Sequence, residues 1–318
     1  MNGSTCSYII GPHRLTRLTW TLKVRSACFS RVFEGDAQVT TGPSAGSRIR
    51  RSGRTARSTL RHMTELAATF QQEAVAEAYQ HRPPYPAEVF DRLVELIVDE
   101  PRRVLDIGAG EGAIARPLAP RVEHVDAIDF SAPMVTAGKQ RPGGDHPNVT
   151  WQVNPIETAD LDGPYALVTA GASIHWMPWE ETFARIVPHL TPNAQLVVVE
   201  HGPVDMPWWD GVVQAIQKHS RKKDHDPKYS VVEAIRDRGL LDLTGTARTA
   251  PVTYRQKVAD YVEQFHSTSS LARDLMTAEE AADFDAIVEE AVHPYAKDGL
   301  LELTLQAELS WGRPKIAG

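Results

Sequence analysis

The stretch of the chain that most limits how it can fold is VLDIGAGEGA, residues 104–113. An apolar segment ends in an acid, Asp106, and three glycines follow at alternate positions, Gly108, Gly110 and Gly112. Helix-forming residues come next. A strand, a glycine turn and a helix N-terminus in this order are typical of a site for a nucleotide-like cofactor, because the glycines let the backbone approach the ligand and the helix end offers free N–H groups.

Strand and helix patterns alternate on both sides of this motif. We predict strands at 104–108, 122–129, 148–153, 165–171 and 194–202, and helices at 65–80, 87–100, 112–118, 131–141 and 180–189. This alternation predicts an α/β fold with a doubly wound, mostly parallel sheet. The segment LTPN, 190–193, is predicted to be a turn before the last of these strands. Farther on we expect helices near 208–220, 230–238 and 257–290, and strands near 244–254 and 300–310.

The composition fits one large domain with attachments, since the chain has 318 residues, of which 42% are apolar. It contains no run of about 18 apolar residues, so we predict no transmembrane helix and a cytoplasmic protein. The only two cysteines, Cys6 and Cys28, lie near the N-terminus. A disulfide framework, a cysteine metal site and a thiol nucleophile are therefore excluded from the rest of the chain, and we predict no metal.

The first 62 residues differ from the rest in charge and composition. They hold 11 basic and 2 acidic residues, whereas the remaining chain holds 34 − 11 = 23 basic and 41 − 2 = 39 acidic residues. We predict that 1–62 is a disordered, Arg-rich extension and that 63–318 is the functional domain, with its core at 102–202. The extension is either an organelle transit peptide or sequence upstream of the natural start at Met63, which we favour because Thr64 is a plausible N-cap.

The charges around the glycine motif distinguish between cofactors. Gly108, Gly110 and Ala113 satisfy a dinucleotide pattern, but a carboxylate at Asp106 would oppose a pyrophosphate and suits an ammonium group. Asp129 ends the next strand, where a carboxylate can accept both ribose hydroxyls. An ammonium partner, a close backbone approach and a ribose partner together describe S-adenosylmethionine. Alternatively, Asp106 caps the glycine turn and Asp129 caps the following helix.

Residues 79–202 resemble the class I S-adenosylmethionine-dependent methyltransferases, in particular the small-molecule group called methyltransferase type 11. The matching motifs are VLDIGAGEG, VDAIDFSAPMV, VTWQVNPIETADL, LVTAGASIHWM and LTPNAQLVVVEHG. The resemblance implies a Rossmann-like methyltransferase fold with a seven-stranded sheet and an N-terminal helical lid. It covers none of the first 62 residues. Two positions depart from the pattern: Pro155 replaces the acid that contacts adenine, and Asn193 replaces a glycine of the last turn.

The resemblance also implies a set of residues that bind S-adenosylmethionine. They are Tyr79, Arg82, Asp106, Gly108, Ala109, Gly110, Asp129, Phe130, Met134, Asn154, Ile156, Glu157 and Ala170. Within YQHRPPYP, Tyr79 and Arg82 are candidates to reach the cofactor carboxylate or to close the lid; alternatively, Tyr79 is a packing residue and Arg82 is solvated. The segment FHSTSSLARDL, 265–275, resembles a stretch that lines the substrate side in related proteins.

Methyl transfer is an in-line displacement that needs no metal and no covalent enzyme intermediate, so positioning supplies most of the rate. An oxygen nucleophile also benefits from a base, and His175 is the best catalytic candidate because it follows the fourth strand at the ligand-binding edge. Alternatively, His175 and Trp176 only shape the cofactor pocket. His201 is a weaker candidate. Four tryptophans near the fourth and fifth strands suggest an aromatic substrate pocket or, equally, packing of lid helices: Trp176, Trp179, Trp208 and Trp209.

The acceptor is predicted to be a small molecule. Residues 63–318 have a net charge of −16, which repels nucleic acid. No Asn-Pro-Pro-Tyr, the motif of enzymes that methylate amino groups of nucleic acids, follows the fourth strand. These residues also contain no cysteine, which argues against arsenite as the acceptor. We predict no membrane partner, and the oligomeric state is not readable. Two other functions remain open: an NADP-dependent Rossmann oxidoreductase, and a methyltransferase homologue that binds the cofactor without catalysis.

Overall fold

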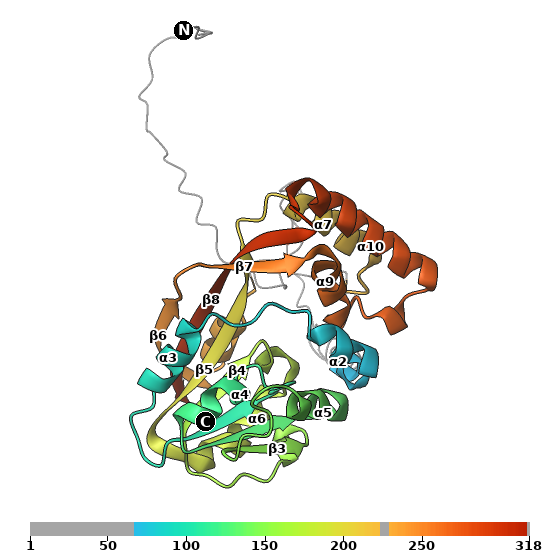
Figure 1. Cartoon of the computed structure of the whole chain (residues 1–318). Helices are drawn as coiled ribbons and strands as arrows, with labels where there is room; N and C mark the ends of the chain where they lie inside the picture. Colours follow the sequence, from blue (N-terminus) through green and yellow to red (C-terminus); the bar gives the residue numbers. More distant parts are fainter. Residues whose placement is uncertain (1–66, 223–228, 317–318) are drawn as a thin grey trace, which may run out of the picture.

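The computed structural model describes residues 67–222 and 229–316. The predictions for the extension 1–62, the start at Met63 and the cap at Thr64 lie outside these residues. The described part contains one mixed sheet whose strands run in the order β3-β2-β1-β4-β5-β8-β6, with β7 also paired to β8 (Figure 1). The strands are β1 Arg103–Ile107, β2 His124–Asp129, β3 Val149–Val153, β4 Tyr165–Gly171, β5 Leu190–Val204, β6 Leu241–Arg248, β7 Val252–Lys257 and β8 Leu300–Pro314.

The first five strands pair in parallel, and β8 is antiparallel to β5, β6 and β7. The predicted doubly wound, mostly parallel sheet is therefore confirmed. Its crossovers and cover are formed by the α-helices α2 Glu73–Tyr79, α3 Glu88–Glu95, α4 Ala115–Leu118, α5 Ala132–Gln140, α6 Trp179–Ile186, α7 Trp209–His219, α8 Val231–Asp237, α9 Val258–Glu263 and α10 Ala278–Val292. Short 3-10 turns adjoin them: η1 Ala68–Gln71, η2 Ala119–Arg121, η3 Ile156–Thr158, η4 Ile174–Trp176, η5 Val187–His189, η6 Gln264–Ser267, η7 Arg273–Leu275 and η8 His293–Tyr295.

The sheet has eight strands but seven positions across its width, because β6 and β7 lie end to end along β8. β6 pairs with the C-terminal half of β8 and β7 with its N-terminal half. The single strand predicted at 244–254 was wrong. Thr249 hydrogen-bonds Ala307 through its backbone and its side chain. Pro251, two residues later, has no N–H to donate, so the strand is interrupted there.

Several predicted helices are shorter or broken in the structure. The helix expected over 87–100 ends at Glu95, and the stretch expected over 257–290 divides into α9, η6, η7 and α10. The helix expected over 65–80 is broken at Gln72, whose extended backbone separates η1 from α2. The helix expected over 112–118 begins only at Ala115, because Gly110 and Gly112 have positive φ and the chain turns before it can coil. Ser131 does cap α5, as predicted, by accepting a hydrogen bond from the backbone N–H of Met134 at 3.2 Å.

The segment LTPN is not a turn but the beginning of β5. The pairing of β4 with β5 shifts register between Tyr165 and Leu167, so these residues form an irregular but extended start to the strand. Asn193 is held by Asp99, which accepts hydrogen bonds from the Asn193 backbone at 2.7 Å and from its side-chain amide at 2.9 Å. This tertiary contact holds in an extended conformation a segment whose local sequence predicts a turn.

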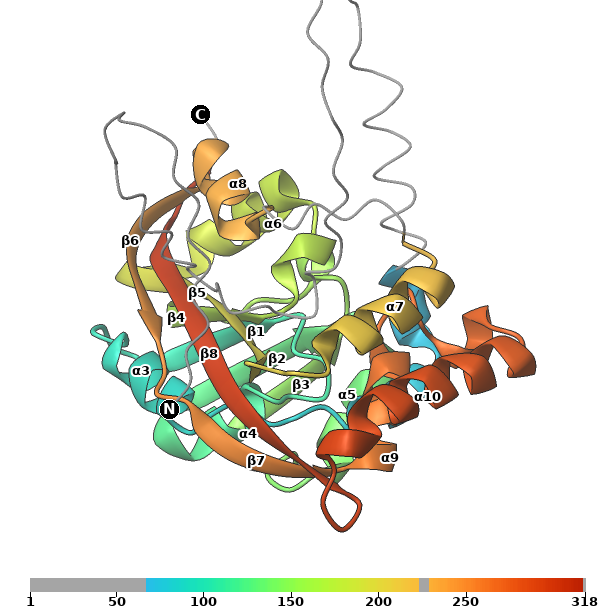
Figure 2. The same ribbon diagram turned by 90° about the horizontal axis from the view of Figure 1, so that it is seen from above.

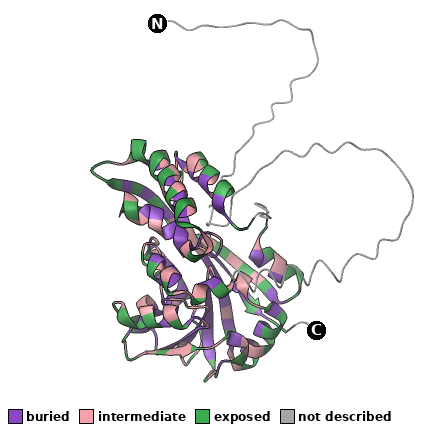
Figure 3. Ribbon diagram, turned by 90° about the vertical axis from the view of Figure 1, so that its right-hand side faces the viewer, coloured by how far each residue is buried: buried purple, intermediate pink, exposed green. Residues whose placement is uncertain are grey.

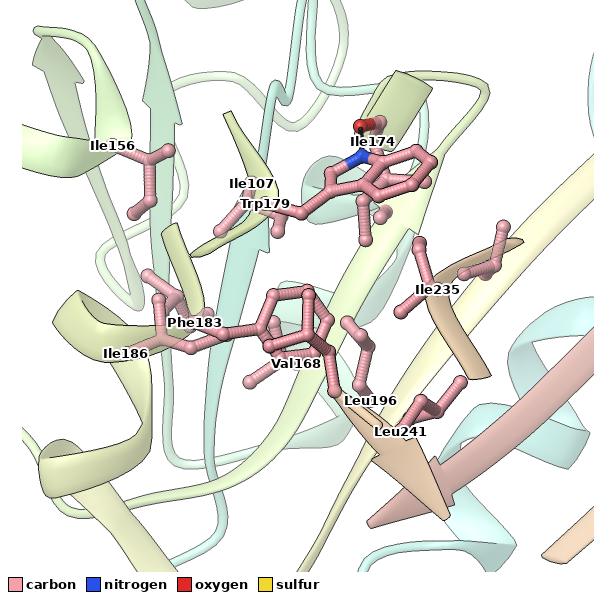
Figure 4. Close-up of a cluster of buried hydrophobic side chains, with 14 of the residues drawn as sticks. Ile107, Ile156, Val168, Ile174, Trp179, Phe183, Ile186, Leu196, Ile235 and Leu241 are labelled. Atoms are coloured by element: carbon pink, nitrogen blue, oxygen red, sulfur yellow. Dashed lines mark hydrogen bonds between the residues drawn. The ribbon is translucent and has the colours of Figure 1, made fainter. Parts of the chain in front are cut away.

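Both faces of the sheet are packed. One face buries a cluster that includes Ile107, Val168 and Leu196 against α6 and α8, with Phe183 and Ile235 at its centre (Figure 4). The other face packs against α3 and α4. Buried strands therefore lie between helices whose outer surfaces are exposed (Figure 3). Among the helices of the described residues, none is both long and apolar enough to cross a bilayer.

A cap stands beyond the carboxyl edge of the parallel strands. The N-terminal half of β8 and strand β7 extend from the sheet to α7, α9 and α10 (Figure 2). Their shared core includes Tyr261, Phe265 and Phe284, and the buried indole N–H of Trp208 donates to the hydroxyl of Tyr261 at 3.0 Å. The cap thus has its own hydrophobic core, continuous in sequence with the sheet but separate in packing.

Charged side chains connect η6 and η7 of the cap to α10. His266, 1% exposed, contacts the Leu271 carbonyl at 2.8 Å and the Asp285 carboxylate at 2.7 Å. Arg273 donates to both Asp285 and Glu263. Burial alone would raise the pKa of Asp285, but the hydrogen bond and charge of His266, followed by the charge of Arg273, outweigh it and lower the pKa.

We expect Asp285→Asn to destabilise the protein at pH 7 by about 1–3 kcal/mol, because a charged hydrogen-bond acceptor is lost. A carboxyl whose folded pKa is lowered stabilises the fold above its unfolded pKa of about 4, and this contribution disappears as the pH falls through the lower folded value. Thermal unfolding should therefore show a difference from wild type at pH 7 that shrinks below pH 4. The neighbouring, exposed Asp274→Asn is the control; an equal effect of both variants would contradict the role of Asp285.

Candidate active site

The glycine loop between β1 and α4 has a backbone that only glycine tolerates easily. Gly108, Gly110 and Gly112 have φ values of +63°, +57° and +75°. A Cβ at Gly108 would lie 2.5 Å from the Cβ of Ser173, and one at Gly112 would lie 2.4 Å from the ring of Trp151. The loop is therefore fixed by both conformation and crowding, and its backbone is the surface that a ligand would meet.

Asp106 lies beneath this loop and is 1% exposed. Its carboxylate accepts hydrogen bonds from the hydroxyl of Thr169 on β4 at 2.7 Å and from the backbone N–H of Ala115 in α4 at 3.1 Å. Burial raises the pKa of Asp106 to about 7. The structure thus shows Asp106 joined to β4 and to the first turn of α4 rather than to the glycine turn, and its contact with an ammonium group stays a prediction.

Asp129 ends β2 directly beside the loop. One carboxylate oxygen accepts from the backbone N–H of Gly110 at 2.7 Å, and the other accepts from the backbone N–H of Ser131 at 2.8 Å. Burial raises the pKa of Asp129, against the effect of these two hydrogen bonds. The acid predicted to bind ribose is therefore next to the glycines predicted to contact the same ligand.

Three further predicted residues gather at this point. The methyl carbon of Met134 lies 3.3 Å from where a Cβ of Gly110 would be, Phe130 follows Asp129 and is partly exposed, and the Asn154 N–H donates to the Asp129 carbonyl at 3.0 Å. Ala109 belongs to the loop itself and donates its N–H to the Ile128 carbonyl. These residues lie around the glycine loop, and their contact with a cofactor stays a prediction.

Three other cofactor candidates have side chains that are packed or bonded elsewhere in the protein. Ile156 and Ala170 are 4% and 0% exposed within the hydrophobic core on the α6 side of the sheet. Glu157 accepts a hydrogen bond from the Thr182 hydroxyl of α6 at 2.8 Å. Each side chain already has a structural role, and contact with a cofactor stays a prediction for all three.

The N-terminal segment packs across α5 beside the glycine loop. The carbonyl of Phe70 in η1 accepts a hydrogen bond from the Ser131 hydroxyl at 2.5 Å, and the Phe70 ring meets the edge of Trp176 with centroids 5.6 Å apart. Helix α2 contacts both α5 and η6 of the cap. This segment is the lid that the sequence predicts.

Tyr79 and Arg82 connect this lid to the cap. Arg82 donates to the Tyr79 hydroxyl at 3.1 Å and lies over the Tyr79 ring, 4.1 Å from its centroid. It also donates to the hydroxyl and the carbonyl of Ser267 in η6, at 2.7 and 3.2 Å. Sequence reasoning missed Ser267, although the surrounding stretch at 265–275 was noted as substrate-side. A contact of Tyr79 or Arg82 with the cofactor stays a prediction.

Two histidines stand at the carboxyl ends of adjacent strands. His175 lies in η4 after β4, and its ring keeps a partly accessible edge. His201 is near the end of β5, contacts the Pro83 carbonyl at 2.9 Å and stacks on Tyr85 with centroids 3.9 Å apart. Burial lowers the pKa of both histidines to about 4, so both are neutral at pH 7.

The four tryptophans do not form a common pocket, and for three of them the structure shows packing, the second of the two alternatives left open by the sequence. Trp179 is in the sheet core, where its N–H donates to the Ile174 carbonyl at 2.8 Å. Trp208 and Trp209 belong to the cap core. Only Trp176 lies at the site, between Phe70 and His175. Nearness in sequence did not predict nearness in space, because these residues belong to different elements: η4, α6 and the start of α7.

Comparison with known proteins agrees with this geometry. Residues 104–193 match the model of a methyltransferase-domain family. The chain is similar to two malonyl-[acyl-carrier protein] O-methyltransferases. The one from Halalkalibacterium halodurans is 32% identical over 126 residues, which is 35% of this chain and 46% of that protein. The one from Halorhodospira halophila is 26% identical over 197 residues, covering 58% and 64%.

The fold is shared with a solved structure from Anaeromyxobacter dehalogenans, described as a "Putative Type II Methyltransferase". The TM-score is 0.56 at 20% identity, and the match covers 73% of this chain and 97% of the other. Residues 104–193 are thus similar to a methyltransferase domain, and the similarity to the curated relatives supports a class I S-adenosylmethionine-dependent methyltransferase. The chain spans about half to two thirds of the length of the two curated relatives. Nothing in these comparisons supports the NADP-dependent alternative.

The residues at the glycine loop fit S-adenosylmethionine. The glycine loop leaves no room for a Cβ at Gly108, and the Asp129 carboxylate stands within hydrogen-bond distance of that loop. Within the described ranges, no group of three or more His, Cys, Asp or Glu side chains could hold a metal ion.

Asp129→Asn should weaken binding of S-adenosylhomocysteine at least about tenfold, on the order of 1.4 kcal/mol, because an amide cannot accept from two hydroxyls as a carboxylate does. Isothermal titration calorimetry measures this directly. Asp126→Asn is the matched control on the same strand. Asp126, three residues before Asp129, is bonded by Tyr165 and Arg103, so the variant should lower thermal stability and leave affinity within twofold. Unchanged affinity in Asp129→Asn would remove Asp129 from the cofactor site.

Proposed function

We propose that this protein transfers a methyl group from S-adenosylmethionine to a small-molecule acceptor by in-line displacement. The observation that carries the proposal is the hydrogen bond from the Gly110 N–H to the Asp129 carboxylate, which supports a role for Asp129 as the ribose-binding acid beside the crowded glycine loop. Both lie at the carboxyl edge of the parallel strands, where open α/β sheets bind ligands.

Bound S-adenosylmethionine supplies an activated methyl group on sulfur. The protein's contribution is to hold the acceptor in line with that group, which can supply several orders of magnitude in rate. Ser131 joins the lid to α5 through the Phe70 carbonyl, and Arg82 joins it to the cap through Ser267. A lid fixed at both ends excludes water and restricts the acceptor to one approach.

His175 is proposed to act on the acceptor. Because burial lowers its pKa to about 4, the imidazole is neutral and keeps a lone pair at physiological pH. It can therefore take a proton from an acceptor that arrives protonated, or donate a hydrogen bond to one that arrives ionised. His201 contacts Pro83 and stacks on Tyr85, which favours a role in holding the lid segment rather than in chemistry.

The names of the two curated relatives suggest the kind of acceptor. Both are O-methyltransferases acting on a malonyl group. We therefore propose oxygen as the atom that this protein methylates. A small metabolite or a carrier-bound acyl group is compatible with this chemistry.

The test combines binding and turnover. Calorimetry with S-adenosylmethionine, S-adenosylhomocysteine and NADPH should show binding of the first two only. Incubation with methyl-labelled S-adenosylmethionine and a pool of small metabolites should transfer label to an acceptor. Binding without transfer across the pool would favour the non-catalytic alternative, and binding of NADPH alone would overturn the proposal.

His175→Ala should lower kcat at least tenfold while circular dichroism and the affinity for S-adenosylhomocysteine stay unchanged. The loss should have the same size at pH 6 and pH 8, because a histidine whose pKa is about 4 is neutral at both. The exposed His293, in the cap, gives the control variant His293→Ala. Wild-type turnover in His175→Ala would exclude the residue from the mechanism.

A further inference from the structure

Arg82 is a partly buried cation without a carboxylate partner among the described residues. Its three hydrogen bonds go to neutral groups, namely the Tyr79 hydroxyl and the hydroxyl and carbonyl of Ser267. Arg273 and Arg103, by contrast, each pair with two carboxylates, whereas Arg185, like Arg82, donates only to a neutral group, the Ala159 carbonyl. Withdrawing a charge from water is costly unless an opposite charge compensates it. Arg82 therefore places a positive charge between the lid and the cap that no carboxylate of the described residues compensates.

The charge of Arg82 reaches the acceptor side of the site. After burial, which is the largest cause, Arg82 lowers the pKa of both His175 and His201. Lys222, an exposed residue just beyond α7, also lowers the pKa of His175. Two cations therefore act on the space next to His175, and the two neutral histidines there add no charge that would compensate them.

The guanidinium also has donors to spare. It carries five N–H groups, and three hydrogen bonds account for the contacts that it makes with described residues. Tyr79 and Ser267 fix the plane of the group from the lid and from the cap. A planar guanidinium that is held in place near His175 is suited to a carboxylate, since paired N–H groups match its two oxygens.

We propose that Arg82 anchors a carboxylate of the methyl acceptor, and that this carboxylate is the group methylated. The proposal rests on the methyl transfer proposed above and adds the class of acceptor and the residue that selects it. Arg82 is then a specificity-determining residue on the acceptor side, not a ligand of the cofactor.

The reaction balances without an added base. One carboxylate oxygen uses a lone pair to form a bond to the methyl carbon, the bond from that carbon to sulfur breaks, and its electron pair stays on sulfur. An anion and a sulfonium cation give a neutral ester and a neutral thioether, and no proton is released. A carboxylate has about four lone-pair sites, so Arg82 can hold it while an oxygen remains available. His175 then orients an already ionised nucleophile.

The chemical test uses the stability of the product. Wild-type protein is incubated with methyl-labelled S-adenosylmethionine and a panel of di- and tricarboxylic acids, each paired with its full amide, together with a small-metabolite extract. Products are treated with mild alkali, which releases labelled methanol from carboxylate esters but not from ethers or methylated amines. Alkali-labile label on acids and none on the amides is the expected result. Alkali-stable label overturns the carboxylate assignment, while absence of label overturns the proposed function and this inference with it.

The residue is tested on the acid that takes most label. Arg82→Gln should raise KM for that acid at least tenfold while the affinity for S-adenosylhomocysteine, measured by calorimetry, stays within twofold. Arg82→Lys should recover part of the loss because it keeps the charge. Ser267→Ala removes one hydrogen-bond acceptor of Arg82 but keeps the charge, so it should raise KM less than Arg82→Gln does. Arg121→Gln, which breaks only a surface pair with Asp91, is the matched control. A tenfold loss of S-adenosylhomocysteine affinity in Arg82→Gln with an unchanged KM for the acid would assign Arg82 to the cofactor and overturn the inference.

Discussion

The buried carboxylate of Asp106 is the interaction on which the rest of the site depends. It joins three elements, because it stands at the end of β1 and accepts hydrogen bonds from Thr169 on β4 and from the first turn of α4. Between β1 and α4 the chain must reverse within a few residues, which it does through three glycines at positive φ. Burying an acid so deeply raises its pKa to about 7, and that cost is tolerated because two donors satisfy it. These bonds act together with those from Gly110 to Asp129 and from Ala109 to the Ile128 carbonyl, which hold the loop beside β2.

The sheet core could be predicted from sequence because its signals are local. Apolar strands, glycines at alternate positions and a serine cap each act within a few residues, so the order of strands and helices from β1 to β5 followed from pattern alone. The errors occurred where a distant contact overrides a local preference. LTPN has the composition of a turn, yet Asp99 holds Asn193 in an extended strand. The continuous helical pattern at 65–80 breaks at Gln72, where the lid folds onto α5.

The candidate site divides in the same way. Asp129 and the glycines were predictable because the motif spacing carries their geometry. The partner of Arg82 could not be predicted, because Ser267 lies 185 residues away and no local sequence signal links the two. The tryptophans show the opposite failure. Neighbours in sequence such as Trp176 and Trp179 separate in space, because one stays on η4 at the site and the other begins α6 and turns into the core.

The two sides of the site carry opposite charges, and this arrangement follows the course of the reaction. Acids lie on the donor side, where Asp129 borders the glycine loop. Cations lie on the acceptor side, where Arg82 and Lys222 act on His175. If the acceptor is the carboxylate proposed above, a cationic donor and an anionic acceptor are each drawn to the side of opposite charge. Both products are neutral, so each loses that attraction when the methyl group has moved, and the same charges that assemble the reactants favour release of the products.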